Sequence, residues 1–278
     1  VSAFTDAGAR ETIRALELGA VDFVLKPKLD DAQAWNNFSD ELIEKVIAAS
    51  GMEIKTKDKV LTGFVRKIEV VEKLSADAVL PKNKIRSQVG SDLVVAIGAS
   101  TGGTEAIAEI LSNLPEEVPG IVIVQHMPEK FTKAFSDRLN GISKLYVKEA
   151  EHGDRLYRGT ALIAPGDRHM ILRSDANGYW VEINEGPPVN RHRPSVDVLF
   201  RSVAQCAGKH ALGILLTGMG ADGAQGLLEI KEAGAHTIAQ DEKSCTVFGM
   251  PREAIRIGAA ADVMDLKRIT LYVTELSR

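Results

Sequence analysis

The hydrophobic pattern of the chain is typical of an α/β protein. Four short apolar runs, each long enough for a buried strand of a parallel sheet, occur at residues 93–97, 121–124, 160–164 and 211–216. Segments with helical periodicity lie between most of them, separated by Gly, Pro and Asn. An alternating pair, residues 170–173 and 179–183, predicts a hairpin. We therefore predict a doubly wound, mainly parallel, Rossmann-like sheet.

Two other zones precede this region. Residues 1–50 contain a helical segment that ends at Gly19, a strand pattern at residues 21–25 and a second helical segment at residues 36–49. This is too little chain to bury a core by itself. Residues 51–92 alternate charged and small residues and indicate a linker. The predicted parts are thus a partial domain (1–50), a linker (51–92) and a main domain (93–278).

Composition narrows the class of protein. The chain has 278 residues, 45% of them hydrophobic and 26% charged, as in an ordinary globular protein. Its formal net charge of -4 gives no basic excess for nucleic acid, and no apolar run is long enough to cross a membrane. Two cysteines cannot form a disulfide framework, so we expect a cytoplasmic protein. Because the chain begins with Val1, we also expect that part of the parent protein precedes it.

The sequence GASTGG, residues 98–103, links the first predicted strand of the main domain to a helix. Its first five residues fit the pattern G-x-S-x-G, in which small neighbours let the chain turn sharply over a serine. Such a turn exposes the hydroxyl of Ser100 at the carboxyl edge of the sheet. The N-terminus of the following helix then offers N–H groups to a developing oxyanion.

Two alternatives to a nucleophilic serine stay open. Residues 98–103 also match a degenerate dinucleotide-binding fingerprint, which would make the domain a nucleotide-binding module. That fingerprint needs an acidic residue where the second strand ends, and His126 occupies this position instead. The other alternative is a structural turn with an exposed serine.

A histidine and an aspartate follow two other predicted strands. His126 comes directly after residues 121–124, so it lies at the same edge as Ser100 if the two strands are neighbours. A hydroxyl needs a base within hydrogen-bond reach, and histidine is the usual one. Asp222 follows residues 211–216 and could orient His126. The order Ser, His, Asp differs from that of the α/β-hydrolases.

Oxyanion donors are predicted from the same loops. The glycines around Met219 let the backbone approach a ligand, and the Met219 N–H could bind an oxyanion. The turn at Thr101 and Gly102 supplies further N–H groups. Taken singly, a strand-end histidine or an Asp-Gly turn is more often structural.

Six motifs carry a resemblance to a known family. They are GASTGGTEA (98–106), VQHMPEKFTKAFSDRL (124–139), APGDRHM (164–170), NRHRPSVDVLF (190–200), LLTGMGADGAQGL (215–227) and VFGMPREAI (247–255). In this order they resemble the catalytic domain of chemotaxis-type protein-glutamate methylesterases.

The resemblance implies an activity and roles for residues. It implies that Ser100 is the nucleophile, His126 the base, Asp222 the orienting acid and the Met219 backbone an oxyanion donor. The implied reaction is hydrolysis of glutamate γ-methyl esters on methyl-accepting chemoreceptors, with deamidation of receptor glutamines and no cofactor. A third alternative is an inactive scaffold that keeps these residues.

Residues 1–50 resemble the last part of a phosphoacceptor receiver domain. Ser2 matches the Ser/Thr at the end of that domain's fourth strand, and Lys26 matches the lysine after its fifth. The phosphoaccepting aspartate is not in this sequence. The resemblance therefore implies that a histidine kinase acts through the full receiver of the parent protein.

Other residues are candidates for substrate contact. His169, Arg191 and His192 could line the site or contact an acidic receptor helix, although surface solvation explains them equally well. Met250 could form a pocket wall or simply pack. No spacing of Cys, His or Asp predicts a metal site. Cys245 is not predicted to be a nucleophile.

Overall fold

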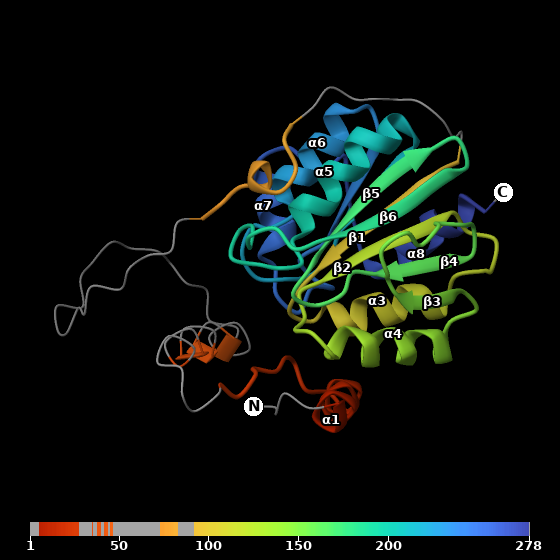
Figure 1. Ribbon diagram of the computed structural model, residues 1–278. Helices are drawn as coiled ribbons and strands as arrows, with labels where there is room; N and C mark the ends of the chain where they lie inside the picture. Colours follow the sequence, from red (N-terminus) through yellow and green to blue (C-terminus); the bar gives the residue numbers. More distant parts are fainter. Residues whose placement is uncertain are drawn as a thin grey trace.

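A seven-stranded, wholly parallel sheet forms the centre of the main domain (Figure 1). The computed structural model describes residues 6–27, 73–82 and 92–277, with a few isolated positions between residues 35 and 46. The strand order is β3-β4-β2-β1-β7-β8-β9. The strands are β1 (Val94–Ala99), β2 (Gly120–Gln125), β3 (Tyr146–Glu149), β4 (Thr160–Ile163), β7 (Ala211–Leu215), β8 (His236–Gln240) and β9 (Asp262–Met264). The predicted doubly wound α/β fold is confirmed.

Helices cover both faces of this sheet (Figure 1). They are α3 (Gly103–Ser112), α4 (Phe131–Ile142), α5 (Val196–Ala207), α6 (Ala224–Glu232), α7 (Met250–Arg256) and α8 (Leu266–Glu275), with a 3-10 turn η2 (Gly208–His210). Helices α3, α4 and α8 share one buried cluster with alternate strand residues, and α5, α6 and α7 share the other.

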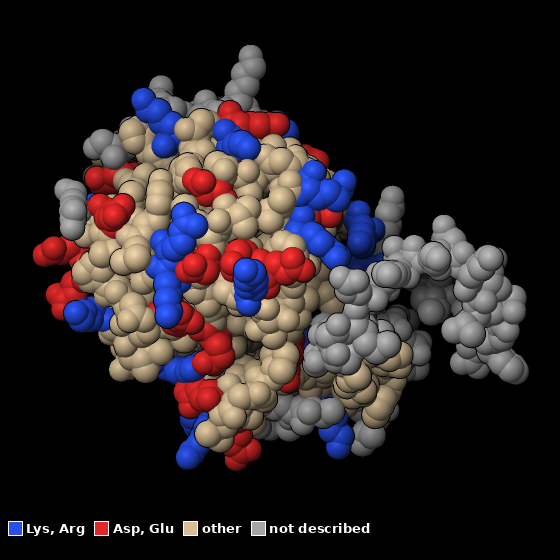
Figure 2. Space-filling view, turned by 180° about the vertical axis from the view of Figure 1, so that it is seen from behind, with Lys and Arg blue, Asp and Glu red and all other residues tan. Residues whose placement is uncertain are grey.

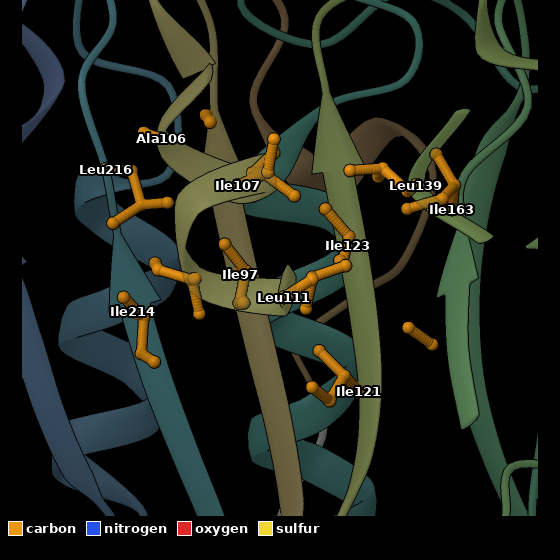
Figure 3. Close-up of a cluster of buried hydrophobic side chains, with 14 of the residues drawn as sticks. Ile97, Ala106, Ile107, Leu111, Ile121, Ile123, Leu139, Ile163, Ile214 and Leu216 are labelled. Atoms are coloured by element: carbon orange, nitrogen blue, oxygen red, sulfur yellow. The ribbon is translucent and has the colours of Figure 1, made fainter. Parts of the chain in front are cut away.

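The apolar runs explain this two-sided core. Successive side chains of a strand point to opposite faces, so a fully apolar strand supplies both clusters. In β1, Ile97 faces α3, where it meets Ile107 and Leu111, as Figure 3 shows. Its neighbour Ala96 belongs to the cluster on the opposite face.

The predicted hairpin is also confirmed. Strands β5 (His169–Asp175) and β6 (Gly178–Asn184) pair in antiparallel register and pack against α5. The Ser202 hydroxyl on α5 accepts a hydrogen bond from the Leu172 N–H at 2.9 Å, which fixes the hairpin to the helix. Strand β6 then leads into residues 185–195, the loop that reaches the carboxyl edge of the sheet.

The described part of residues 1–50 packs on the main domain. Helix α1 (Asp6–Glu17) shares the core cluster of α3 and α4, and the ring of Phe23 stacks on Phe131 at 4.8 Å between centroids. The strand predicted at residues 21–25 is wrong: only Leu25 makes an isolated bridge. A strand needs a neighbour along its length, and the described residues beside this segment provide none. Lys26 is exposed, and Ser2 and most of the second predicted helix lie outside the described residues.

Part of the predicted linker is attached to the main domain. Residues 73–82 contain the short 3-10 helix η1 (Ala76–Ala78), and both Ala76 and Leu80 are buried against the β5 and α5 side chains. The Arg201 guanidinium on α5 donates to the Asp77 carboxylate at 2.8 Å and to the Leu80 carbonyl at 3.0 Å. This segment therefore forms part of the folded domain.

Arg201 also gives a prediction about the stability of the main domain. Its guanidinium also forms a bidentate pair with Glu229 on α6, at 2.9 and 2.7 Å, and both side chains are almost fully buried. We expect Arg201→Ala to lower the free energy of unfolding by about 3 kcal/mol or more, because Glu229 would remain as a buried, unpaired charge. Urea denaturation measures this change. Arg256→Ala, which breaks the exposed pair with Glu253, is the control and should have little effect. Equal effects of the two substitutions would contradict the prediction.

Candidate active site

The register of the parallel strands brings Ser100 and His126 together. Ala99 is opposite Gln125 in the β1–β2 pair, so the next residue of each strand lies at the same level of the carboxyl edge. The His126 N–H donates to the Ala99 carbonyl at 3.1 Å, and the Ser100 N–H donates to the Thr217 carbonyl beyond β7 at 3.0 Å. Ser100 thus lies between the ends of β2 and β7.

The turn at Ser100 has the form that the pattern predicts. The Gly103 N–H donates to the Ser100 carbonyl at 2.8 Å, and α3 begins at that glycine. The positive φ of 79° falls on Gly102, where a side chain would also collide with Thr246. Gly218 lies so close that a methyl group there would be 2.8 Å from the Ser100 Cβ. Small residues therefore let the chain pass tightly around a half-buried serine.

His126 is bound to Asp222 through its Nε2 atom. The distance from Nε2 to Asp222 Oδ2 is 2.8 Å, and the carboxylate side chain is 1% exposed. The Nδ1 atom is buried and has no hydrogen-bond partner in the described part of the chain. Since an ionised Asp222 can only accept, Nε2 carries the proton and Nδ1 holds the free lone pair. The ring is turned opposite to the usual triad, in which the aspartate binds Nδ1.

Asp222 is a buried anion at the N-terminus of α5. Its Oδ2 also accepts from the Val196 N–H at 2.7 Å. Its Oδ1 accepts from the Ser195 hydroxyl and the Asn190 amide, each at 2.8 Å, and from the Asp197 N–H at 3.3 Å. Burial by itself would raise the pKa of Asp222, but the hydrogen bond and charge of His126 and the Asn190 hydrogen bond hold the pKa well below its ordinary value.

Asn190 and Ser195 were not predicted as site residues, although both lie in the NRHRPSVDVLF motif. Pro194 and Ser195 directly before an apolar helical pattern are a signal for a helix start, and free N–H groups at a helix start bind anions. This signal could have indicated that α5 supports a carboxylate. The identity of that carboxylate needs the tertiary structure.

His192 lies against His126. Its ring stacks on His126 with centroids 3.7 Å apart and planes inclined by 14°. Burial, followed by the charge of His126, lowers the pKa of His192 to about 3, so His192 is neutral here. It belongs to a tight turn at residues 189–192, closed by backbone hydrogen bonds of 3.0 and 2.8 Å. His192 therefore lies beside His126, and its contact with a substrate stays a prediction.

His169 does not fit the predicted substrate contact. It is fully buried, its Nε2 donates to the Pro187 carbonyl at 3.0 Å, and its Nδ1 accepts from the Ser195 N–H at 3.2 Å. Burial lowers its pKa, so the ring is a neutral bridge between two loops. Surface solvation was one explanation for His169 in the sequence. These two backbone partners explain why the ring is buried instead.

Arg191 and Met250 lie in different environments. Arg191 is exposed at the tip of the 189–192 turn, where its φ is 70°. Met250 is fully buried, and its sulfur fills the space beside Gly218. Met250 therefore supports the loop next to Ser100 from behind.

The predicted oxyanion donors differ in their availability. In the described part of the chain, no protein oxygen accepts from the backbone N–H of Met219 or of Gly102. The side chain of Thr101 is already used, because its buried hydroxyl donates to Asp22 in the N-terminal segment. The backbone N–H groups, and not the threonine hydroxyl, are the candidates for binding an oxyanion.

Neither a nucleotide nor a metal is favoured by the geometry. Gly103 lies against the Gln125 side chain, whose Nε2 donates to the Ser100 carbonyl at 2.9 Å, so protein atoms fill the space beside this glycine. Among the described residues there is no cluster of His, Cys, Asp and Glu that could hold a metal ion.

On the described part of the face in Figure 2, acidic and basic side chains are interspersed. None of the described helices is long and apolar enough to span a membrane.

The fold and the site are those of an α/β enzyme of the hydrolase class. The chain belongs to the CheB methylesterase family, whose model matches residues 95–273, as the sequence motifs predicted. A protein-glutamate methylesterase/protein-glutamine glutaminase of Geobacter metallireducens is 50% identical over 266 residues, which cover 96% of this chain and 71% of the relative. The corresponding protein of Xanthomonas oryzae pv. oryzae is 52% identical over 266 residues, covering 95% and 75%.

A solved structure shows the same likeness. The crystal structure of the Thermotoga maritima CheB methylesterase catalytic domain matches with a TM-score of 0.66 and 39% sequence identity. The match covers 67% of this chain and 100% of that one. It therefore corresponds in extent to the main domain.

The orientation of His126 can be tested directly. We expect one imidazole nitrogen of His126 to be protonated and this nitrogen to be Nε2, because Asp222 accepts from it. Two-bond 1H–15N correlation spectra of 15N-labelled protein distinguish the two tautomers of a neutral imidazole. The His126→Gln variant assigns the resonance. A neutral ring that is protonated at Nδ1 would contradict the geometry.

Proposed function

We propose that this chain hydrolyses glutamate γ-methyl esters on methyl-accepting chemoreceptors and deamidates certain receptor glutamines, in the cytoplasm. The names of the relatives support the reaction type. The observation that carries the proposal is the arrangement of His126, which follows β2 at the level where Ser100 follows β1 and donates to Asp222 through Nε2 at 2.8 Å. Within the described residues its Nδ1 atom has no hydrogen-bond partner.

The proposed reaction begins at Ser100. Nδ1 of His126 takes the hydroxyl proton while Oγ attacks the ester carbonyl, and the carbonyl π electrons move to oxygen. The N–H groups of Met219 and Gly102 bind this oxyanion. The tetrahedral intermediate then collapses, and the methoxy group leaves as methanol with the proton from His126. Water, activated by the same nitrogen, hydrolyses the acyl-enzyme to a glutamate carboxylate and free Ser100.

Deamidation follows the same path with a different leaving group. A glutamine side chain gives the same acyl-enzyme, and ammonia leaves in place of methanol. In both reactions His126 becomes an imidazolium while Ser100 attacks. The lowered pKa keeps Asp222 ionised, so its charge stabilises that imidazolium without accepting its proton.

We also propose that residues 1–50 are the last part of a receiver domain and that a histidine kinase acts on the parent protein through it. Lys26 and Ser2 then match the receiver positions described above. The described segment contacts the main domain next to Ser100 through the Asp22–Thr101 hydrogen bond, and it also contacts α4 through Glu17, which pairs with Arg138 at 2.7 Å. These contacts support a role in limiting access to Ser100.

Substitution of the three site residues tests the reaction. We expect Ser100→Ala and His126→Ala each to lower turnover by about 10⁴-fold or more, and Asp222→Ala by less, because its role is indirect. The assay is methanol release from methylated chemoreceptor membranes. Ser112→Ala at the end of α3 is the matched control and should retain activity. Release that persists in Ser100→Ala would exclude the proposed nucleophile.

If only the His126 variant stayed active, His192 would become the candidate base, because its ring is next to His126. His169 is excluded from that role by its burial and by the two hydrogen bonds of its ring.

The contact of the N-terminal segment gives a separate prediction. Thr101→Val removes the hydroxyl that donates to Asp22, and Asp22→Ala removes the acceptor together with the Asp22–Lys45 pair; neither changes Ser100 or His126. We expect either substitution to raise turnover, by up to about tenfold, because such a bond contributes about 1.5 kcal/mol. Glu11→Ala on the exposed side of α1 is the control. Unchanged turnover in both variants would show that the contact does not limit access.

A further inference from the structure

A second buried carboxylate lies beside Asp222, and the reaction above does not use it. Asp197 is the second residue of α5 and is 7% exposed. Its Oδ2 accepts from the Asn190 amide at 2.7 Å, and its Oδ1 accepts from the Gly226 N–H at 2.6 Å. A buried carboxylate is costly unless it has such partners, so its presence near the site needs an explanation.

The amide of Asn190 connects the two carboxylates. Its Nδ2 atom donates one hydrogen to Asp197 at 2.7 Å and the other to Asp222 at 2.8 Å. The backbone of Asn190 is fixed as well, since its φ is 51° and its N–H donates to the Leu74 carbonyl at 3.0 Å. Because Asp197 binds one hydrogen of this amide group, it fixes the orientation of the amide and so the direction of the other hydrogen bond, which goes to Asp222.

The two carboxylates also cap neighbouring helices. Asp222 precedes α6 and accepts from Val196, the first residue of α5. Asp197 lies on α5 and accepts from Gly226, in the first turn of α6. The start of α5 therefore binds the carboxylate that precedes α6, and the start of α6 binds the carboxylate that lies on α5. The free N–H groups and the dipole of a helix start favour an anion at both positions. A shift of Asp197 would move the start of α6 and the loop that carries Asp222.

The charges around Asp197 come from three elements. Burial, the Asp222 charge and, more weakly, Glu229 on α6 raise the pKa of Asp197, while the Gly226 and Asn190 hydrogen bonds lower it; the result is about 7. Arg201, one turn further along α5, is paired with Glu229. Because the folded pKa lies above the ordinary value, the protonated form contributes stability below about pH 4, and this contribution is lost as the pH rises towards 7.

We propose that Asp197 is a positioning residue of the reaction centre, which acts through the shared amide of Asn190. It fixes the direction of the Asp222 carboxylate and so the plane of His126, whose Nε2 binds that carboxylate. The kinetic consequences rest on the proposed function, but the effect on the site does not.

Asp197→Asn tests the proposal in the full chain. The new amide keeps the shape of the carboxylate, but it offers only one acceptor oxygen to the Asn190 and Gly226 donors. We expect kcat for methanol release to fall about tenfold with KM nearly unchanged, a smaller loss than that expected for Asp222→Ala. Ser202→Ala is the control, because it removes a buried hydrogen-bonding group of α5 that does not contact Asp222.

A second readout needs no receptor. The rate at which a fluorophosphonate labels Ser100, measured against pH, reports the state of the free site. In the wild type we expect the rise with pH to be spread over coupled ionisations of Asp197 and its neighbours. In Asp197→Asn the ionisation of residue 197 is absent. The labelling rate should then rise more steeply with pH, as expected for the ionisation of a single group. Labelling without methanol release would refute the proposed function and leave this test intact.

Asn190→Ala removes the same bridge without changing α5, so the test stands even if Asp197→Asn folds poorly. Because both residues act on Asp222 through one amide, the double variant should lose little more than either single variant. Fully additive losses would overturn the proposal. A labelling profile unchanged from the wild type in Asp197→Asn, with a kcat loss no larger than that of Ser202→Ala, would also overturn it.

Discussion

The site depends on keeping one buried negative charge, that of Asp222, ionised and in place. Five donors do this, from His126, Asn190, Ser195 and the first two N–H groups of α5. Without them the carboxyl group would gain a proton on burial, and His126 would lose the acceptor that orients it. The start of α5 stabilises the ionised carboxylate in two ways. Its N–H groups, which would otherwise lack acceptors, bind the carboxylate, and its dipole favours an anion. The loop at residues 189–195, which follows the hairpin, therefore holds Asp222 in place.

The parallel sheet provides the other half of the geometry. Adjacent parallel strands end at one edge, and the register of β1 with β2 fixes Ser100 next to His126. The β1–β7 pair brings the loop at residues 217–223 to the other side of Ser100. Gly218 and Gly223 allow this approach, since a side chain at either position would collide with Ser100 or with Val196. Small residues in these loops are thus required by close contacts between the strand ends.

Patterns local in the sequence predicted the strands β1, β2, β4 and β7 of the sheet and the hairpin, but not β3, β8 and β9. They also indicated the three residues that the resemblance implied. Strand ends are visible as apolar runs followed by small or polar residues, so the amino-acid sequence alone was enough to place Ser100, His126 and Asp222 on one edge. Features that depend on distant partners could not be predicted in this way. The segment at residues 21–25 has the composition of a strand, but the described residues provide no neighbouring strand for it. His169 is polar but buried, because Pro187 and Ser195 form hydrogen bonds with its ring. The turned ring of His126 follows only from where α5 holds Asp222.

The attachment of residues 73–82 extends the site beyond the sheet. The Leu74 carbonyl accepts from Asn190, the residue whose amide holds Asp222, and Val79 lies against Gly186 in the same loop. Asp77 and Leu80 are bound to Arg201, which is on the helix whose N-terminus receives the anion. A segment that composition assigns to a linker therefore contacts both supports of Asp222. Its detachment would free the backbone of Asn190 and one side of α5 together, so the packing that holds Asp222 includes residues 73–82 as well as the sheet.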